Sequence, residues 1–180
     1  MLNGELEKLL PKERFKHSLR VAHEAVKLAR YYGAPEEKAK IAAIFHDCSR
    51  YMDRGQMLEA AKFYKLKISE LEKKEPKLLH AKLSREIAKR KFKINDRQVL
   101  SAIEKHTTGS EKMTLLEKII YLADHIEINR RFNGVKKVRM LAYKDLNAAI
   151  AASAGSMIVE LVKKDLPIFL ETVKTRNAHL

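Results

Sequence analysis

Apolar residues recur three and four positions apart along almost the whole chain, which is the spacing of one face of an α-helix. Apolar and polar residues rarely alternate over four or more positions, as they would in a half-buried strand. The pattern therefore predicts an all-α protein. No internal repeat or low-complexity linker divides the sequence, so we expect one domain over residues 1–180 with its core in about residues 12–170.

Capping and turn residues divide this pattern into successive helices. Gly33, followed by Pro35, and Gly109 are expected to end helices, because glycine readily adopts the left-handed C-cap conformation. Thr114 and Glu117 have the spacing of a capping box. We expect helices at about residues 12–32, 35–47, 56–64, 115–128, 135–141 and 146–164. Two more helices are expected to begin at about residue 79 and at about residue 97, the latter capped by Asn95 or Asp96. A polar stretch up to Pro76 precedes these two, and a short tail ends the chain. The stripe expected to be buried on the first helix is Phe15, Leu19, Ala22, Val26 and Ala29.

Composition narrows the class of protein. The chain is 46% hydrophobic and 33% charged, which is typical of a soluble globular protein. Its single cysteine, Cys48, excludes an intrachain disulfide and fits a reducing compartment. We find no signal peptide and no apolar run of the roughly 18–20 residues that span a bilayer. We therefore expect a cytoplasmic protein without a membrane partner.

The net charge of +14 is the most unusual bulk property. Basic proteins often bind nucleic acid, anionic membranes or polyanionic small molecules. Here the lysines are scattered, and no compact basic run with interleaved aromatic residues occurs. The charge therefore favours solvated helix faces and a field that attracts phosphates, and we expect no nucleic-acid partner.

Four side chains indicate a metal site. His46 and Asp47 follow the apolar run Ile-Ala-Ala-Ile-Phe, and Asp124 lies within the most apolar helix of the chain. A buried charge there is costly unless it is paired or bound to a cation. His17, on the first helix, completes a set of two imidazoles and two carboxylates from three helices. This mixture suits iron, manganese, zinc or cobalt better than calcium.

Each of these residues also has a simpler interpretation. His17 taken alone is a core or rim histidine, and His46-Asp47 could form a helix C-cap. Asp124 could pair with Lys118 or His125. Of the other histidines, His125 should point about 100° away from Asp124 along the helix, His23 should lie on the surface and His179 in the tail. We expect no catalytic thiol at Cys48.

The order His, His-Asp, Asp resembles that of the HD-domain phosphohydrolases. The segments Arg14–Val21 and Ala42–Asp47 are similar to the first two motifs of that superfamily. His80, His106-Thr107-Thr108-Gly109 and Met113–Arg130 resemble its YqeK-like branch, the symmetrical dinucleoside-tetraphosphate hydrolases. The likeness covers about residues 12–170 and implies a single HD-type helical bundle.

The resemblance implies cleavage of diadenosine tetraphosphate (Ap4A) into two ADP by attack of a metal-activated water on a phosphoanhydride. Iron is the metal it implies, and manganese, cobalt or zinc are alternatives. The matching metal positions are His17, His46, Asp47 and Asp124. The catalytic positions are Asp47, His80 and His106, and the substrate-binding positions are Arg14, Arg50, His80, His106, Thr107 and Arg130. One departure is Arg50, where relatives usually carry lysine; its planar fork changes the phosphate geometry.

Other functions remain open from the sequence. An HD-type nucleotidase acting on (deoxy)nucleoside mono- or triphosphates would use the same cage. A regulatory nucleotide-binding module would be expected to lose a ligand, whereas all four are present. The apolar segment of residues 148–162 fits either a core or a homodimer face.

Overall fold

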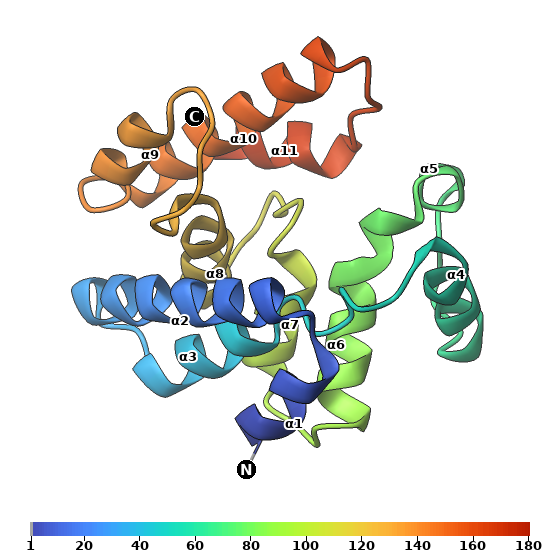
Figure 1. Ribbon diagram of the computed structural model, residues 1–180. Helices are drawn as coiled ribbons and strands as arrows, with labels where there is room; N and C mark the ends of the chain where they lie inside the picture. Colours follow the sequence, from blue (N-terminus) through green and yellow to red (C-terminus); the bar gives the residue numbers. More distant parts are fainter. Residues whose placement is uncertain (1) are drawn as a thin grey trace.

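The computed structural model describes residues 2–180, and within this range the chain forms helices and no strand, which confirms the all-α prediction (Figure 1). In chain order the elements are α1 (Leu2–Leu9), α2 (Lys12–Tyr32), α3 (Glu36–Phe45), α4 (Arg54–Phe63), α5 (Glu70–Lys74), the 3-10 helix η1 (Pro76–Leu79), α6 (His80–Arg90), α7 (Arg97–Lys105), α8 (Leu115–Ile126), α9 (Val135–Leu141), α10 (Leu146–Lys163) and α11 (Leu170–Ala178).

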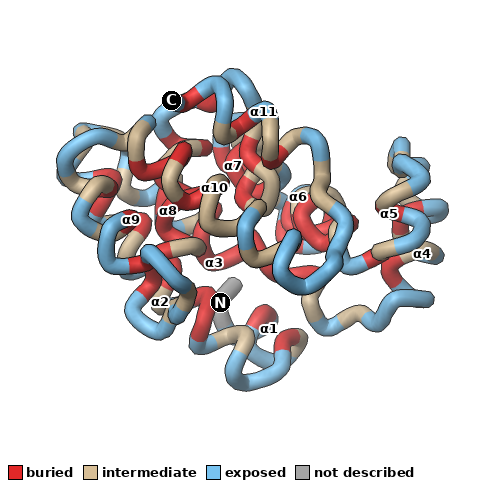
Figure 2. The backbone as a smooth tube through the Cα atoms, turned by 90° about the horizontal axis from the view of Figure 1, so that it is seen from above, coloured by how far each residue is buried: buried red, intermediate tan, exposed pale blue. Residues whose placement is uncertain are grey.

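The centre of the molecule is formed by α2, α3, α7 and α8, which pack on one another. Helices α9, α10 and α11 cover one side of this centre, and α4 and α5 lie apart on another (Figure 1). The tube in Figure 2 shows long buried stretches in α3, α6, α7 and α8. A smaller cluster under α4 consists of Met57, Ala61, Leu79 and Leu83.

The predicted helix at residues 12–32 and the one at 135–141 have the boundaries that the structure shows. Three short helices were not predicted: α1, α5 in the expected polar stretch and α11 in the expected tail. Capping and packing explain them. Ser69 and Glu72 form a capping box for α5, α11 packs against α10, and Leu6 of α1 is fully buried.

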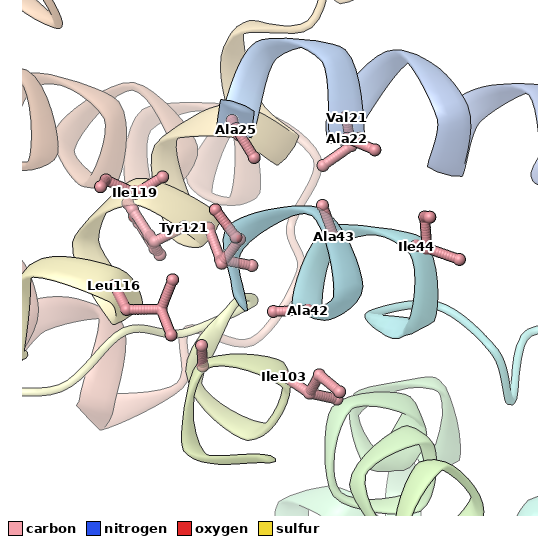
Figure 3. Packing of buried hydrophobic residues seen from close by; sticks show 14 of the residues in the cluster. Val21, Ala22, Ala25, Ala42, Ala43, Ile44, Ile103, Leu116, Ile119 and Tyr121 are labelled. Atoms are coloured by element: carbon pink, nitrogen blue, oxygen red, sulfur yellow. The ribbon is translucent and has the colours of Figure 1, made fainter. Parts of the chain in front are cut away.

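The buried face of α2 differs from the predicted stripe. Leu19 is 42% exposed, whereas Val21, Ala25 and Leu28 are fully buried. The reason is that α2 packs against α3 and α8 together, so the face between these two neighbours is buried. In Figure 3, Val21 and Ala25 point toward α3 and α8, where Ala43 and Tyr121 are labelled. Small residues at this contact let α2 and α3 approach closely.

Gly109 ends its helical turn as predicted, with a left-handed backbone (φ +68°). It has a second role that the sequence does not show. A β-carbon at this position would lie 2.5 Å from Cγ2 of Thr175 in α11. The Thr175 hydroxyl also donates to Thr108 O at 2.8 Å. Helix α11 therefore holds the loop that follows His106, and His179, which was expected in a tail, is buried just after this helix.

By length and composition alone, α10 could cross a membrane, which corrects the expectation that no segment could. This is weak support for a membrane protein, because core helices of soluble proteins pass the same test. In the structure α10 packs against α8, α9 and α11, and Ala149, Ile150 and Ala154 are fully buried.

The predicted capping box at the start of α8 is present. Thr114 Oγ1 accepts the Glu117 amide, and Glu117 Oε2 accepts the Thr114 amide at 2.8 Å. The other carboxylate oxygen of Glu117 accepts hydrogen bonds from Ser101 and Lys105 of α7. Glu117 therefore ties α7 to the helix that carries Asp124.

Glu117→Gln should destabilise the fold in a pH-dependent way. Burial alone would raise the pKa of this carboxyl, but its bonds to Ser101 and Lys105 hold the pKa below the ordinary 4.5. The carboxylate therefore stabilises the fold fully above about pH 4.5, the ordinary pKa of a glutamate side chain. This stabilisation is lost as the pH falls through the lowered pKa of the folded protein. We expect a loss of about 1–3 kcal/mol near neutral pH, measured by urea unfolding. The difference from the wild type should shrink at acidic pH, and an equal loss at both pH values would contradict this role.

Candidate active site

Four buried imidazoles present Nε2 toward one centre. They belong to His17 on α2, His46 at the end of α3, His80 at the start of α6 and His106 at the end of α7. Three of them donate from Nδ1 to the backbone carbonyl three residues earlier, which places the proton on Nδ1 and leaves the Nε2 lone pair free. These acceptors are Ala43 O at 2.6 Å from His46, Lys77 O at 2.6 Å from His80 and Ile103 O at 2.7 Å from His106.

The position of these histidines at helix ends explains the shared geometry. His46 and His106 are the C-cap residues of α3 and α7, and His80 follows the 3-10 helix η1. Carbonyl groups in the last turn of a helix have no partner within the helix and can accept a side-chain N–H. The helix-cap interpretation of His46 is therefore correct as well, and it is the cap that aims Nε2 inward.

His17 is oriented by a carboxylate instead of a carbonyl. Its Nδ1 lies 3.3 Å from Glu127 Oε1, and Arg20 Nε donates to Glu127 Oε2 at 2.9 Å. Its Nε2 lies 2.9 Å from Asp124 Oδ1 without hydrogen-bond geometry. Glu127 is buried, so Arg20 and His17 satisfy a charge that would otherwise be costly.

The two carboxylates lie among these rings. Asp47 Oδ1 is 3.6 Å from His80 Nε2 and 3.7 Å from His106 Nε2, and its Oδ2 is 3.7 Å from His46 Nε2. Asp124 Oδ1 is also 3.7 Å from His46 Nε2. These separations exceed hydrogen-bond range, and His46 Nε2 is buried without a partner among the described residues. Three overlapping sets of donors could each hold a metal ion: His17–His46–Asp47, His46–His106–Asp124 and Asp47–His80–His106.

The protonation states of the cluster are those that a metal ion requires. Burial alone would raise the pKa of both carboxyls, but charged and hydrogen-bonding neighbours hold each pKa well below its usual range. For Asp47 these neighbours are imidazoles, above all that of His46. For Asp124 they are His17 and Arg130. Burial also lowers the pKa of His46 to about 4 and that of His80 to about 3. The carboxylates are therefore charged and these two imidazoles neutral at physiological pH.

Three arginines surround the cluster. Arg14 Nη1 is 3.0 Å from Asp47 Oδ2, and Arg50 Nε is 3.4 Å from Asp47 Oδ1. Arg130 pairs with the Asp124 carboxylate and donates from Nε to the Asp124 carbonyl at 2.7 Å. Asp124 therefore pairs with Arg130 and not with Lys118, which instead binds Asn147 Oδ1 at 2.7 Å.

A cavity of about 220 Å³ opens over the cluster. Its walls include Asp47 and five more of the residues predicted for the site. Among these, Thr107 Oγ1 lies 2.9 Å from His80 Nε2 and 3.0 Å from His106 Nε2. The structure thus brings all predicted metal, catalytic and substrate-binding residues together. The lining residues are Asp47, Arg50, His80, Thr107, Asp124, His125, Arg130, Phe132 and Met157.

Sequence reasoning missed part of this site. His125 lines the cavity beside Asp124, although it was expected to point away, and Phe132 and Met157, which were not predicted as site residues, also line it. Glu127 could have been noticed from its spacing, since it lies one helical turn beyond Asp124. Cys48 is buried, and burial raises its pKa to about 12, so its thiol is protonated at physiological pH.

Known proteins share both this fold and these motifs. Residues 14–129 match the HD domain family. Proteins named symmetrical bis(5'-nucleosyl)-tetraphosphatase are similar over 93% of this chain: the one from Halalkalibacterium halodurans is 43% identical over 89% of its own length, and that from Bacillus subtilis 40% over 90%. A crystal structure from Clostridium acetobutylicum, described as a predicted HD superfamily hydrolase involved in NAD metabolism, has 38% identity and a TM-score of 0.95, covering 99% of this chain and 94% of that one.

The helical fold and the cluster of histidines and aspartates are therefore those of an HD-domain hydrolase, a class that uses a divalent metal. Within this superfamily the chain belongs to the YqeK-like family of symmetrical bis(5'-nucleosyl)-tetraphosphatases.

Glu127→Gln should weaken metal binding about 10- to 100-fold, because outer-sphere partners of metal-binding histidines have effects of that size. The amide leaves the shape of the side chain almost unchanged but removes the charge that faces His17 Nδ1 and Arg20. Metal affinity is measured by competition with a chelator. Glu13→Gln on the exposed side of α2 is the control. Equal affinities of the Glu127 variant and the wild type would show that Glu127 does not orient His17.

Proposed function

We propose that this protein hydrolyses Ap4A symmetrically into two ADP. One observation carries the proposal: a cluster of four imidazoles and two carboxylates opens into a cavity whose walls also carry Arg50 and Arg130. Such a cavity suits a polyphosphate, because guanidinium groups bind phosphate oxygens with two parallel hydrogen bonds. The names of the relatives from Halalkalibacterium halodurans and Bacillus subtilis support the same activity.

The metal that this activity requires would be held by His17, His46, Asp47 and Asp124. The buried, unpartnered Nε2 of His46 supports this assignment, as does the approach of His17 Nε2 to Asp124 Oδ1. His17 Nε2 and Asp124 Oδ1 are both acceptors and lie 2.9 Å apart, an arrangement that is stable when a cation or a proton lies between them. A bound cation would polarise a phosphoryl oxygen and make water a better nucleophile at neutral pH. Iron is the metal we expect, and the donor set also suits manganese, cobalt and zinc.

The remaining residues act on the phosphates. Arg50 and Arg130 neutralise charge on the bridging and terminal oxygens, and Arg14, which pairs with Asp47 Oδ2, adds positive charge beside them. The Thr107 hydroxyl can donate to His80 Nε2 or His106 Nε2, and these three side chains contact the phosphate chain. Asp47 orients the attacking water.

In symmetrical cleavage, the oxygen of water bonds to one of the two central phosphorus atoms, and the oxygen that bridged them leaves with the second ADP. The nucleoside diphosphate is a fair leaving group, so the site needs little help from a general acid. This agrees with the neutral state of the buried His80 imidazole, whose pKa is lowered to about 3 by burial.

Product analysis tests the proposed function. Metal-replete protein is incubated with Ap4A in ¹⁸O-labelled water, and the nucleotides are separated and weighed. We expect ADP alone, with one labelled oxygen for each pair of molecules. ATP with AMP would mean asymmetrical cleavage. Turnover of deoxynucleoside mono- or triphosphates, with Ap4A left intact, would identify the nucleotidase instead.

We also propose that the protein does not bind nucleic acid, although its surface is basic. Some of the surface lysines form ion pairs within one turn of their own helix, as Lys16 does with Glu13 and Lys73 with Glu70. Steep salt dependence of binding to duplex DNA would contradict this part.

A further inference from the structure

A second cavity adjoins the first and has a different chemical character. It lies between α8, the segment after α8 and α10, and it has a volume of about 170 Å³. Its lining consists of His125, Phe132, Ser153, Ser156, Met157 and Glu160, and we refer to it as the α8–α10 cavity. We propose that the α8–α10 cavity binds the purine base of the nucleotide, which rests on the proposed function of the adjoining site.

The two cavities are neighbours in the structure. His125, Phe132 and Met157 line both of them. A ligand with its phosphates at Arg50 and Arg130 can therefore extend directly past these three side chains into the α8–α10 cavity. Neither cavity alone reaches the roughly 300–1,000 Å³ of typical ligand sites, but the two together do.

The wall chemistry of the α8–α10 cavity suits a base better than a phosphate. Phe132 and Met157 provide a flat ring and a polarisable thioether, the kinds of groups against which bases pack. No lysine or arginine is among the residues that line it. A phosphate placed there would lose its counter-charges, whereas an aromatic base would gain contact area.

The polar groups of the α8–α10 cavity indicate hydrogen bonding to the edge of the base. Ser153 Oγ is buried beside the Tyr121 hydroxyl, and when one of these two hydroxyls donates to the other, one O–H remains for a ligand to satisfy. Glu160 is half-buried, and its nearest cations, Lys163 and Lys164, lie at 3.9 and 3.7 Å. An ionised carboxylate only accepts hydrogen bonds, so Glu160 selects a base edge that carries an amino group, as adenine does.

Calorimetry measures the binding of ADP and of inorganic pyrophosphate to metal-replete protein. Comparing the two affinities distinguishes the contribution of the base from that of the phosphates. Phe132→Leu should weaken ADP binding about tenfold, the loss expected for one base–aromatic contact, and leave pyrophosphate binding unchanged. Glu160→Gln should weaken ADP binding but strengthen binding of inosine diphosphate, because the amide can donate to the carbonyl that replaces the amino group. Val159→Ala, an exposed neighbour on α10, is the control.

Phe132 also packs against the core, so Glu160→Gln provides the test in a variant that leaves the core unchanged. Equal losses for ADP and pyrophosphate, or unchanged ADP and inosine diphosphate binding in both variants, would overturn the base site. Failure of the proposed function has a different outcome: Ap4A would remain intact with the wild type, while the comparison of ADP with pyrophosphate would still report on the base site.

Discussion

Asp47→Asn is expected to abolish Ap4A hydrolysis, lowering kcat/KM by at least about a thousandfold, well beyond the effect of an outer-sphere residue. Asp47 approaches three of the four imidazoles, and it also contacts Arg14 and Arg50. The amide keeps the shape but removes the charge that neutralises a cation and orients water. Activity is measured as ADP release at saturating metal.

Folding and charge are controlled separately for Asp47→Asn. The helical circular dichroism spectrum should match that of the wild type, since Asp47 lies beyond the end of α3. Asp165→Asn changes the same charge at an exposed loop residue whose positive φ of 49° asparagine tolerates, and it should keep full activity. A metal-loaded Asp47 variant with a substantial part of the wild-type rate would refute the role of Asp47.

The second large effect is metal-dependent stability. A ligand at 100 times its Kd stabilises the folded state by about 2.7 kcal/mol, which corresponds to about 5–10 °C in Tm for a chain of this size. We expect such a shift when manganese or ferrous iron is added to chelator-treated protein under anaerobic conditions. His46→Gln should remove most of the shift, because it replaces a fully buried imidazole whose Nε2 has no other partner among residues 2–180.

His23→Gln is the matched control for surface binding of metal. His23 lies on α2, like His17, but it is exposed, as the sequence predicted. It should leave the metal-induced shift unchanged. The same shift in wild type and in His46→Gln would place the metal elsewhere on the protein.

The ends of helices could be predicted from the sequence where strong capping residues mark them. Gly33 has the left-handed backbone of a C-cap, and Thr114 with Glu117 closes the predicted box. The short helices α1 and α11 were missed because they depend on tertiary contacts, such as that of Thr175 with Thr108. The predicted burial of Leu19 was wrong for a related reason: periodicity gives a helical face, but the neighbours of the helix decide which face is buried.

The candidate site was largely visible in the sequence because its chemistry conflicts with its surroundings. Asp124 within an apolar helix and His46-Asp47 at the end of another both required a partner. What could not be predicted is the arrangement across distant elements. Met157 reaches the cavity because α10 packs on α8, and Arg130 turns back to Asp124 after the end of α8. No local pattern specifies either contact.

The most direct test of the central claim is the rate of ADP formation from Ap4A measured against the metal content of the same protein samples. We expect no turnover after complete removal of metal and a rate that rises in proportion to the metal restored. Full activity in metal-free protein would contradict it.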